Sequence, residues 1–129
     1  MIWPLLLLVP LAFAGETISE ELDGAAAAKK AIEWREQCEK SDGRACGDLG
    51  ALHVMGKGVA RDEAMAFKLY EKACRFGQPL RCLRAAIFAL NGHGTPRSSE
   101  RGTELLSLGC KLLDADSCAA YYEIGRAHV

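Results

Sequence analysis

The segment CEKSDGRAC, residues 38–46, holds two cysteines separated by seven residues, and this C-x7-C spacing returns twice along the chain. Successive pairs are 36 residues apart, which gives three of them: Cys38 and Cys46, Cys74 and Cys82, and Cys110 and Cys118. A fixed period of this size is typical of proteins built from stacked repeats, in which neighbouring units bury a shared core. The sequence therefore predicts a row of similar units, each carrying one cysteine pair.

The spacing within a pair restricts the path of the chain. On one straight helix, Cys38 and Cys46 would have Cα atoms about 12 Å apart, whereas a disulfide needs roughly 4.4–6.8 Å. A bridged pair therefore requires the chain to reverse between its cysteines. Turn signals lie there, Asp42-Gly43 in the first pair and Gly77 followed by Pro79 in the second. We expect each bridge to join the end of one helix to the start of the next and to contribute about 2–3 kcal/mol.

The period alone leaves the pairing of the six cysteines open. Joining the two cysteines of each C-x7-C treats every unit alike and leaves none single. Joining Cys46 to Cys74 and Cys82 to Cys110 also respects the period, but it leaves Cys38 and Cys118 without partners, so it ranks second. A metal site is disfavoured because structural zinc usually requires closely spaced pairs such as C-x2-C, which the sequence lacks. We expect no metal and no cofactor.

The units read as helical hairpins, so the predicted fold class is all-α. Apolar residues recur at steps of three and four between glycine-rich loops such as Gly56-Lys57-Gly58. The chain is expected to hold about two full hairpins with a half-unit on each side. The predicted helices cover residues 25–38, 44–55, 61–75 and 80–91, then a helix from 97 or 98 to 112, and finally residues 117–122.

The first 24 residues differ in composition from the repeats. Residues 1–14 are expected to be a secretory signal peptide, since their apolar run is too short to span a bilayer and ends at Ala12-Phe13-Ala14. They lack the basic residue that usually opens such a leader. Residues 15–24 are expected to be an acidic lead-in. An even number of cysteines fits an oxidising compartment, so the predicted location is secreted or periplasmic, without a membrane anchor.

Charge and the last residues set two further expectations. The formal net charge is −1 with no long run of one sign, which predicts no recruitment to nucleic acid or to anionic membranes. Residues 123–129, EIGRAHV, are expected to be a non-native tail, because translating a widely used sequencing adapter gives the same peptide. The predicted repeat array therefore covers residues 25–122.

The first complete unit resembles the Sel1-like repeat, an αα-hairpin of the tetratricopeptide type. The resemblance is carried by the pattern Ala45-x3-Leu49-Gly50-x2-His53-x2-Gly56-x-Gly58-Val59-x2-Asp62-x3-Ala66-x2-Leu69-Tyr70-x2-Ala73-Cys74-x2-Gly77. The added C-x7-C in each unit is similar to the secreted, cysteine-rich bacterial subgroup of that family. This resemblance implies an α/α superhelix in which each C-x7-C pair is bridged.

The second unit departs from the pattern. His53 and Ala89 take the usual tyrosine position of the two units, Arg81 stands where alanine is expected, and Ala86 replaces glycine. In the second loop, Thr95 and Ser98 replace valine and aspartate. The packing of this unit is therefore the least defined by the resemblance.

The resemblance implies a binding protein. Superhelices of this kind present a concave face formed by the first helix of each hairpin, where we expect a protein or peptide partner. The candidate binding residues are the non-consensus positions on those helices, namely Asp48, Ala51, Arg84, Ile87 and Asn91. The alternative interpretation, to which we give equal weight, is that these five residues are ordinary solvent-exposed surface.

Catalysis is the alternative, because some members of the cysteine-rich subgroup are described as β-lactamases or penicillin-binding proteins. The sequence lacks S-x-x-K, S-D-N and K-T-G elements. It therefore offers no residue that could be named as catalytic. We expect His53 to be a hydrogen-bonded packing residue and His93 to lie in a solvated loop.

Overall fold

A computed structural model describes residues 23–128, which form helices joined by loops and turns. The first described helix covers residues 23–39. It is followed by α2 (Gly43–Met55), α3 (Glu63–Arg75), α4 (Pro79–Asn91), α5 (Ser99–Cys110) and α6 (Ala115–Ala127). The all-α prediction is confirmed. The expected signal peptide, residues 1–14, lies outside the described residues, and residues 23 and 24 of the expected lead-in already belong to the first helix.

The starts of the helices recur with the same 36-residue period as the cysteines. Helices α2, α4 and α6 begin at Gly43, Pro79 and Ala115, which are 36 residues apart. Two of these helices are capped by aspartate, because the side chains of Asp42 and Asp114 accept hydrogen bonds from backbone N–H groups in the first turn. The same start signal therefore occurs at α2 and α6, two periods apart, whereas Gln78 before α4 makes no side-chain capping hydrogen bond.

The second helix of each hairpin has its own cap. The carboxylate of Asp62 accepts a hydrogen bond from the Met65 amide at 3.0 Å, and the hydroxyl of Ser98 accepts one from the Arg101 amide at 3.1 Å. The serine that departs from the family pattern thus performs the same role as the aspartate, since both side chains offer an oxygen to the orphan N–H groups.

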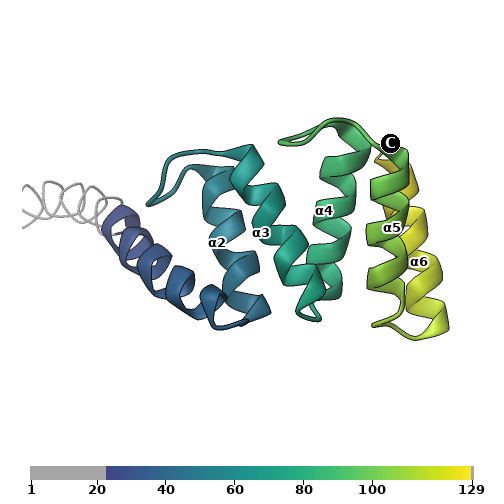
Figure 1. Ribbon diagram of the computed structural model, residues 1–129, viewed down its shortest axis with the longest axis horizontal. Coiled ribbons are helices and arrows are strands. Elements are labelled where there is room, and N and C mark those ends of the chain that lie inside the picture. Colours follow the sequence, from purple (N-terminus) through teal and green to yellow (C-terminus); the bar gives the residue numbers. More distant parts are fainter. Residues whose placement is uncertain (1–22, 129) are drawn as a thin grey trace, which may run out of the picture.

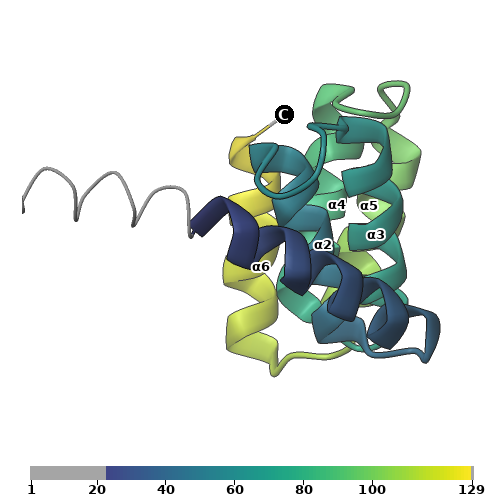
Figure 2. The same cartoon turned by 90° about the vertical axis from the view of Figure 1, so that its left-hand side faces the viewer.

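The helices stand side by side in a row and form a short superhelix (Figure 1). Consecutive helices pack against each other, and α3 also contacts α5 while α4 contacts α6. Viewed along the row, α3 and α5 lie on one side and α6 on the other (Figure 2). The alternation places α2, α4 and α6 in one layer and their partner helices in a second layer.

Three disulfides join successive hairpins: Cys38–Cys46, Cys74–Cys82 and Cys110–Cys118. Their Cα–Cα distances are 4.7, 4.4 and 4.8 Å, which a single straight helix could not produce at a separation of eight residues. Each bridge crosses the turn between one hairpin and the next. In Figure 1 these turns follow the lower edge of the row, whereas the glycine-rich loops within the hairpins follow the upper edge.

The turn at the first bridge differs from the expected one. The positive φ falls at Ser41 (69°), and Gly43 is already the first residue of α2. Gly43 is buried, and a Cβ built there would come within 2.8 Å of the Phe76 Cβ atom. The glycine is therefore required for close packing against the next turn. The expected stop at Gly77 is present, with φ of 90°.

Each glycine-rich loop packs on the helix that precedes its hairpin. Gly58 has φ of 72° and lies against the backbone of Ala27 and Ala28 in the first helix. One period later, Gly94 has φ of 67° and lies against the backbone of Glu63 and Ala64 at the start of α3. A side chain at either position would occupy the space of that backbone, so the loops give neighbouring units a second regular contact besides the disulfides.

Small residues fill much of the core. Ala66, Ala73, Ala85, Ala86 and Ala89 are fully buried, which lets helices pack closely. The core has two clusters, and α3 contributes to both of them, one through Phe67 and Tyr70 and the other through Leu69 and Ala73. Helix α3 is therefore the element that connects the first half of the row to the second.

Two glycine variants separate backbone strain from close contact. Gly77→Ala should lower the free energy of unfolding by about 1 kcal/mol, because φ is positive but no neighbouring atom lies within 4 Å. Gly94→Ala should lower it by about 2–4 kcal/mol, because the added methyl also overlaps the α3 backbone. Denaturant unfolding of the oxidised proteins measures both values, and equal losses would contradict the loop contact.

Candidate functional site

A groove opens on the layer formed by α2, α4 and α6. Its volume is about 800 Å³. Basic and apolar side chains from all three helices line it, together with the turn before α4. The lining residues are Arg44, Asp48, Gln78, Pro79, Leu80, Arg81, Leu83, Arg84, Ile87, Ile124 and His128.

Three of the five predicted binding residues line this groove. Asp48, Arg84 and Ile87 belong to its wall. Ala51 is half-buried and Asn91 is exposed at the end of α4, and neither belongs to the wall. The prediction relied on departures from the family pattern, so it selected unusual residues whether or not they face the groove.

The residues that this reasoning missed repeat with the period. Leu80 lies 36 residues after Arg44, just as Arg84 lies 36 after Asp48. Equivalent positions of stacked units face the same way, so applying the period to Asp48 and Arg84 and stepping back one helical turn would have found both residues. Ile124 and His128 fall in the segment expected to be a non-native tail, which here continues α6 to Ala127. The tail expectation itself remains a prediction.

Arg81 forms a polar cluster at the junction of α2 and α4. Its guanidinium donates to the Asp48 carboxylate at 2.9 Å and lies over the Tyr70 ring, 5.5 Å from the centroid. Its aliphatic stem occupies the space beside Gly47, where a Cβ would overlap it. The arginine that replaces the expected alanine is therefore accommodated by a glycine, an acid and an aromatic ring in the preceding unit.

The charges of the groove are unbalanced. Arg81 and Asp48 neutralise each other across α2 and α4. Arg44 and Arg84 also line the groove, and neither forms an ion pair with another residue of the described part of the chain. Three arginines and one aspartate leave a formal charge of +2 in the groove, whereas the whole chain carries −1.

Apolar surface accompanies these charges. Leu80 is 72% exposed and Ile124 is 47% exposed, and both line the groove beside the half-buried Leu83 and Ile87. Exposed aliphatic side chains gathered in one hollow are typical of binding surfaces, because covering them removes apolar area from water.

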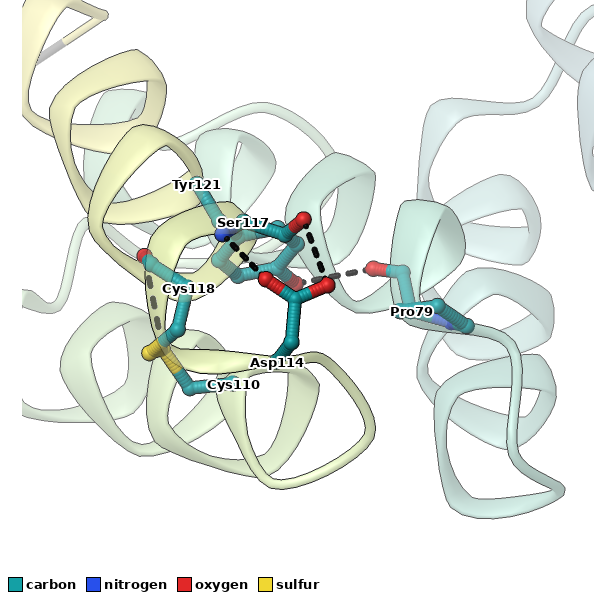
Figure 3. The surroundings of a disulfide bond; sticks show 6 residues. All are labelled: Pro79, Cys110, Asp114, Ser117, Cys118 and Tyr121. Atoms are coloured by element: carbon teal, nitrogen blue, oxygen red, sulfur yellow. Dashed lines mark hydrogen bonds between the residues drawn. A yellow bond between two sulfur atoms is a disulfide. The ribbon is translucent and has the colours of Figure 1, made fainter.

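Tyr121 holds α6 in place as the far wall of the groove. Its ring is buried in the space beside Gly109, and its hydroxyl donates a hydrogen bond to the Pro79 carbonyl at 2.9 Å. Burial raises the pKa of the Tyr121 hydroxyl, so it stays protonated as a donor. Figure 3 shows Tyr121 extending toward Pro79 and the Cys110–Cys118 bridge on its other side. In the same turn, hydrogen bonds from Ser117 lower the pKa of Asp114.

The histidines lie apart from the groove wall just described, except for His128. His53 is half-buried and its Nδ1 atom lies 3.1 Å from the Ala60 carbonyl oxygen, in agreement with a packing role. His93 is exposed in the α4–α5 loop. Residues 23–128 contain no group of three His, Cys, Asp or Glu side chains that could hold a metal ion. None of the helices described is both long and apolar enough to cross a bilayer.

Several solved structures share this architecture. Cysteine rich protein B of Helicobacter pylori is 26% identical with a TM-score of 0.64, over 70% of this chain and 68% of that one. A Sel1 repeat protein from Oxalobacter formigenes is 22% identical with a TM-score of 0.61, over 70% and 68% of the two chains. No family model and no curated protein matches the sequence.

A third structure is matched over a small part of its own length. It is c5321, a protective antigen present in uropathogenic Escherichia coli strains and displaying an SLR fold. It is 18% identical with a TM-score of 0.63, over 78% of this chain but only 26% of that chain. Likeness at this level of identity, as for the Oxalobacter protein, concerns the fold.

The 36-residue helical hairpins and the bridge at each junction define a disulfide-containing α/α repeat protein. The structural relatives share the Sel1-like repeat fold and include a cysteine-rich protein. The chain has the fold of the Sel1-like repeat proteins and is similar to their cysteine-rich members, as its sequence pattern predicts.

A double-mutant cycle tests the polar cluster. Asp48→Ala and Arg81→Ala should show a coupling free energy of about 1 kcal/mol, because this pair is partly buried and joins two units. The Arg61–Glu63 pair is more exposed and joins near neighbours, so its coupling should stay below about 0.5 kcal/mol. Denaturant unfolding supplies the four free energies of each cycle, and coupling no larger in the first than in the second would refute the role of Arg81.

The anchoring of α6 is tested by removing one oxygen atom. Tyr121→Phe should lower the free energy of unfolding by about 1 kcal/mol, because the Pro79 carbonyl loses a buried donor while the ring is retained. Tyr122→Phe is the matched control, since no hydrogen bond joins the Tyr122 hydroxyl to a described residue, and it should change stability by less than about 0.5 kcal/mol. Equal effects in thermal or denaturant unfolding would argue against the anchor.

Proposed function

We propose that this chain is a secreted or periplasmic repeat protein that binds a segment of another protein in the groove between α2, α4 and α6. The observation that carries the proposal is the groove itself, with exposed leucine and isoleucine side chains beside two arginines that form no ion pair with another described residue. Protein interfaces combine these same features, an apolar centre with arginine at high frequency. Repeat superhelices generally use such extended surfaces for binding other proteins.

The rigidity of the groove supports this role. Its walls come from three helices that are separate in sequence, and the disulfides fix the start of each of them relative to the preceding hairpin. A surface that is already in its binding shape loses less conformational entropy when a partner docks. A short stack without these bridges would present the same residues on helices that move relative to one another.

The disulfides also support the proposed location. Bridges of this kind persist in oxidising compartments and are rare in the cytosol, and each described cysteine belongs to one. An apolar leader at residues 1–14 with a small-residue cleavage site is consistent with export. The alternative hydrolase function gains no specific support from the described residues.

A peptide library tests the proposal without knowledge of the natural partner. Oxidised protein should enrich a set of displayed peptides, and the enriched peptides should lose affinity at least about tenfold for Leu80→Ser, which removes the most exposed apolar side chain of the groove. Ile32→Ser is the matched control, because Ile32 is also exposed (59%) but lies on the first helix and outside the groove.

The control variant should bind as the unmodified protein does. Absence of any enriched peptide would contradict the proposed function. An equal effect of the two substitutions would place the binding surface elsewhere and would also contradict it. Circular dichroism of both variants verifies that they retain the helical fold.

A further inference from the structure

We infer that the segment bound in the groove is acidic, with carboxylate side chains close to apolar ones, and that Arg44 and Arg84 select it. This inference rests on the proposed function and adds the chemistry of the partner. It follows from the charge of the groove, the pairing of its arginines and the position of its apolar residues.

The charge of the groove is opposite in sign to that of the chain. The chain as a whole has one more acidic than basic residue, yet the groove holds three arginines and a single aspartate. Opposite charge attracts a partner during approach and disfavours partners of like charge, so a charge excess confined to a binding surface acts on specificity. A carboxylate-rich segment is the protein chemistry that complements this surface.

The pairing of the arginines identifies which of them are available. Arg81 is held by the Asp48 carboxylate and lies on the Tyr70 ring, so its charge is already compensated. Arg44 and Arg84 are exposed, and within the described residues they have no acidic partner. A guanidinium can bind a carboxylate through two parallel hydrogen bonds, which gives orientation as well as attraction.

The apolar residues of the groove determine which side chains of the partner lie next to its carboxylates. Leu80 and Arg84 are four residues apart on α4, so they lie on one face of that helix about one turn apart. Ile87, three residues beyond Arg84 on α4, also lines the groove and extends its apolar surface. A partner that satisfies Arg84 therefore places neighbouring side chains against aliphatic surface, where leucine, isoleucine or an aromatic residue would be buried.

The same surface argues against a phosphate polymer. Binding to nucleic acid depends on many basic residues that contact successive phosphates, whereas this groove offers, among aliphatic side chains, two arginines without an acidic partner in residues 23–128. An acidic protein segment uses both the charge and the apolar area, and a phosphate polymer would use only the charge.

Two measurements test the inference: the amino-acid composition of the selected peptides, and their affinity for a variant in which the charge of the two groove arginines is reversed. Selection on the unmodified protein should enrich Asp and Glu next to bulky apolar residues. The Arg44→Glu/Arg84→Glu variant should weaken the best of these peptides at least about tenfold in fluorescence anisotropy. Lys29→Glu/Lys68→Glu is the matched control, because it makes the same change in net charge at exposed positions outside the groove, and it should stay within about threefold.

The outcomes separate this inference from the proposed function. Enriched peptides without acidic residues, whose binding depends on Leu80 but not on the arginines, would overturn the inference and leave the proposed function standing. Equal losses of peptide affinity in the two charge-reversal variants would show that attraction depends on the net charge of the protein and not on the groove arginines, and would overturn the inference as well. Single-stranded DNA or polyphosphate binding as tightly as the best peptide at physiological salt would overturn it in favour of a phosphate polymer.

Discussion

The disulfide across each turn is the constraint on which the rest of this structure depends. Helices of twelve or thirteen residues are marginal by themselves, and in a row of stacked hairpins each unit packs only against its neighbours. Fixing Cys74 and Cys82 with Cα atoms 4.4 Å apart sets the end of α3 beside the start of α4 and removes much of the freedom that the unfolded chain would have there. With the turn fixed, small core residues such as Ala73 and Ala85 suffice, because packing begins from helices that are already adjacent.

The groove is a consequence of that arrangement. Repeated junctions bring α2, α4 and α6 into one layer, so side chains from residues 36 apart become neighbours on one surface. Differences between units then become the chemistry of the surface. Arg44 in one unit and Leu80 in the next occupy equivalent positions, and together they give the groove both charge and apolar area. The departures from the family pattern that make the second unit unusual, above all Arg81 against Gly47 and Asp48, tie the two units together instead of loosening them.

Much of the fold could be predicted from the sequence because its signals are local and repeated. The cysteine period and the loop glycines each indicate what the backbone must do at a known position. The left-handed residue at Ser41 could not be predicted in this way, because Asp42-Gly43 is the stronger turn signal and the need for glycine at position 43 comes from Phe76, far along the chain. The groove was only partly predictable for the same reason. Asp48 and Arg84 stand out as unusual residues, but the pairing of Arg81 and the exposure of Leu80 depend on how the units stack.

The central claim is that the three turns are closed by bridges within each C-x7-C pair. The most direct measurement is mass spectrometry of peptides from the native, unreduced protein after proteolysis. The account predicts disulfide-linked fragments joining Cys38 to Cys46, Cys74 to Cys82 and Cys110 to Cys118, each of which separates on reduction. Fragments that join Cys46 to Cys74 or Cys82 to Cys110, or cysteines that react with an alkylating reagent before reduction, would contradict it.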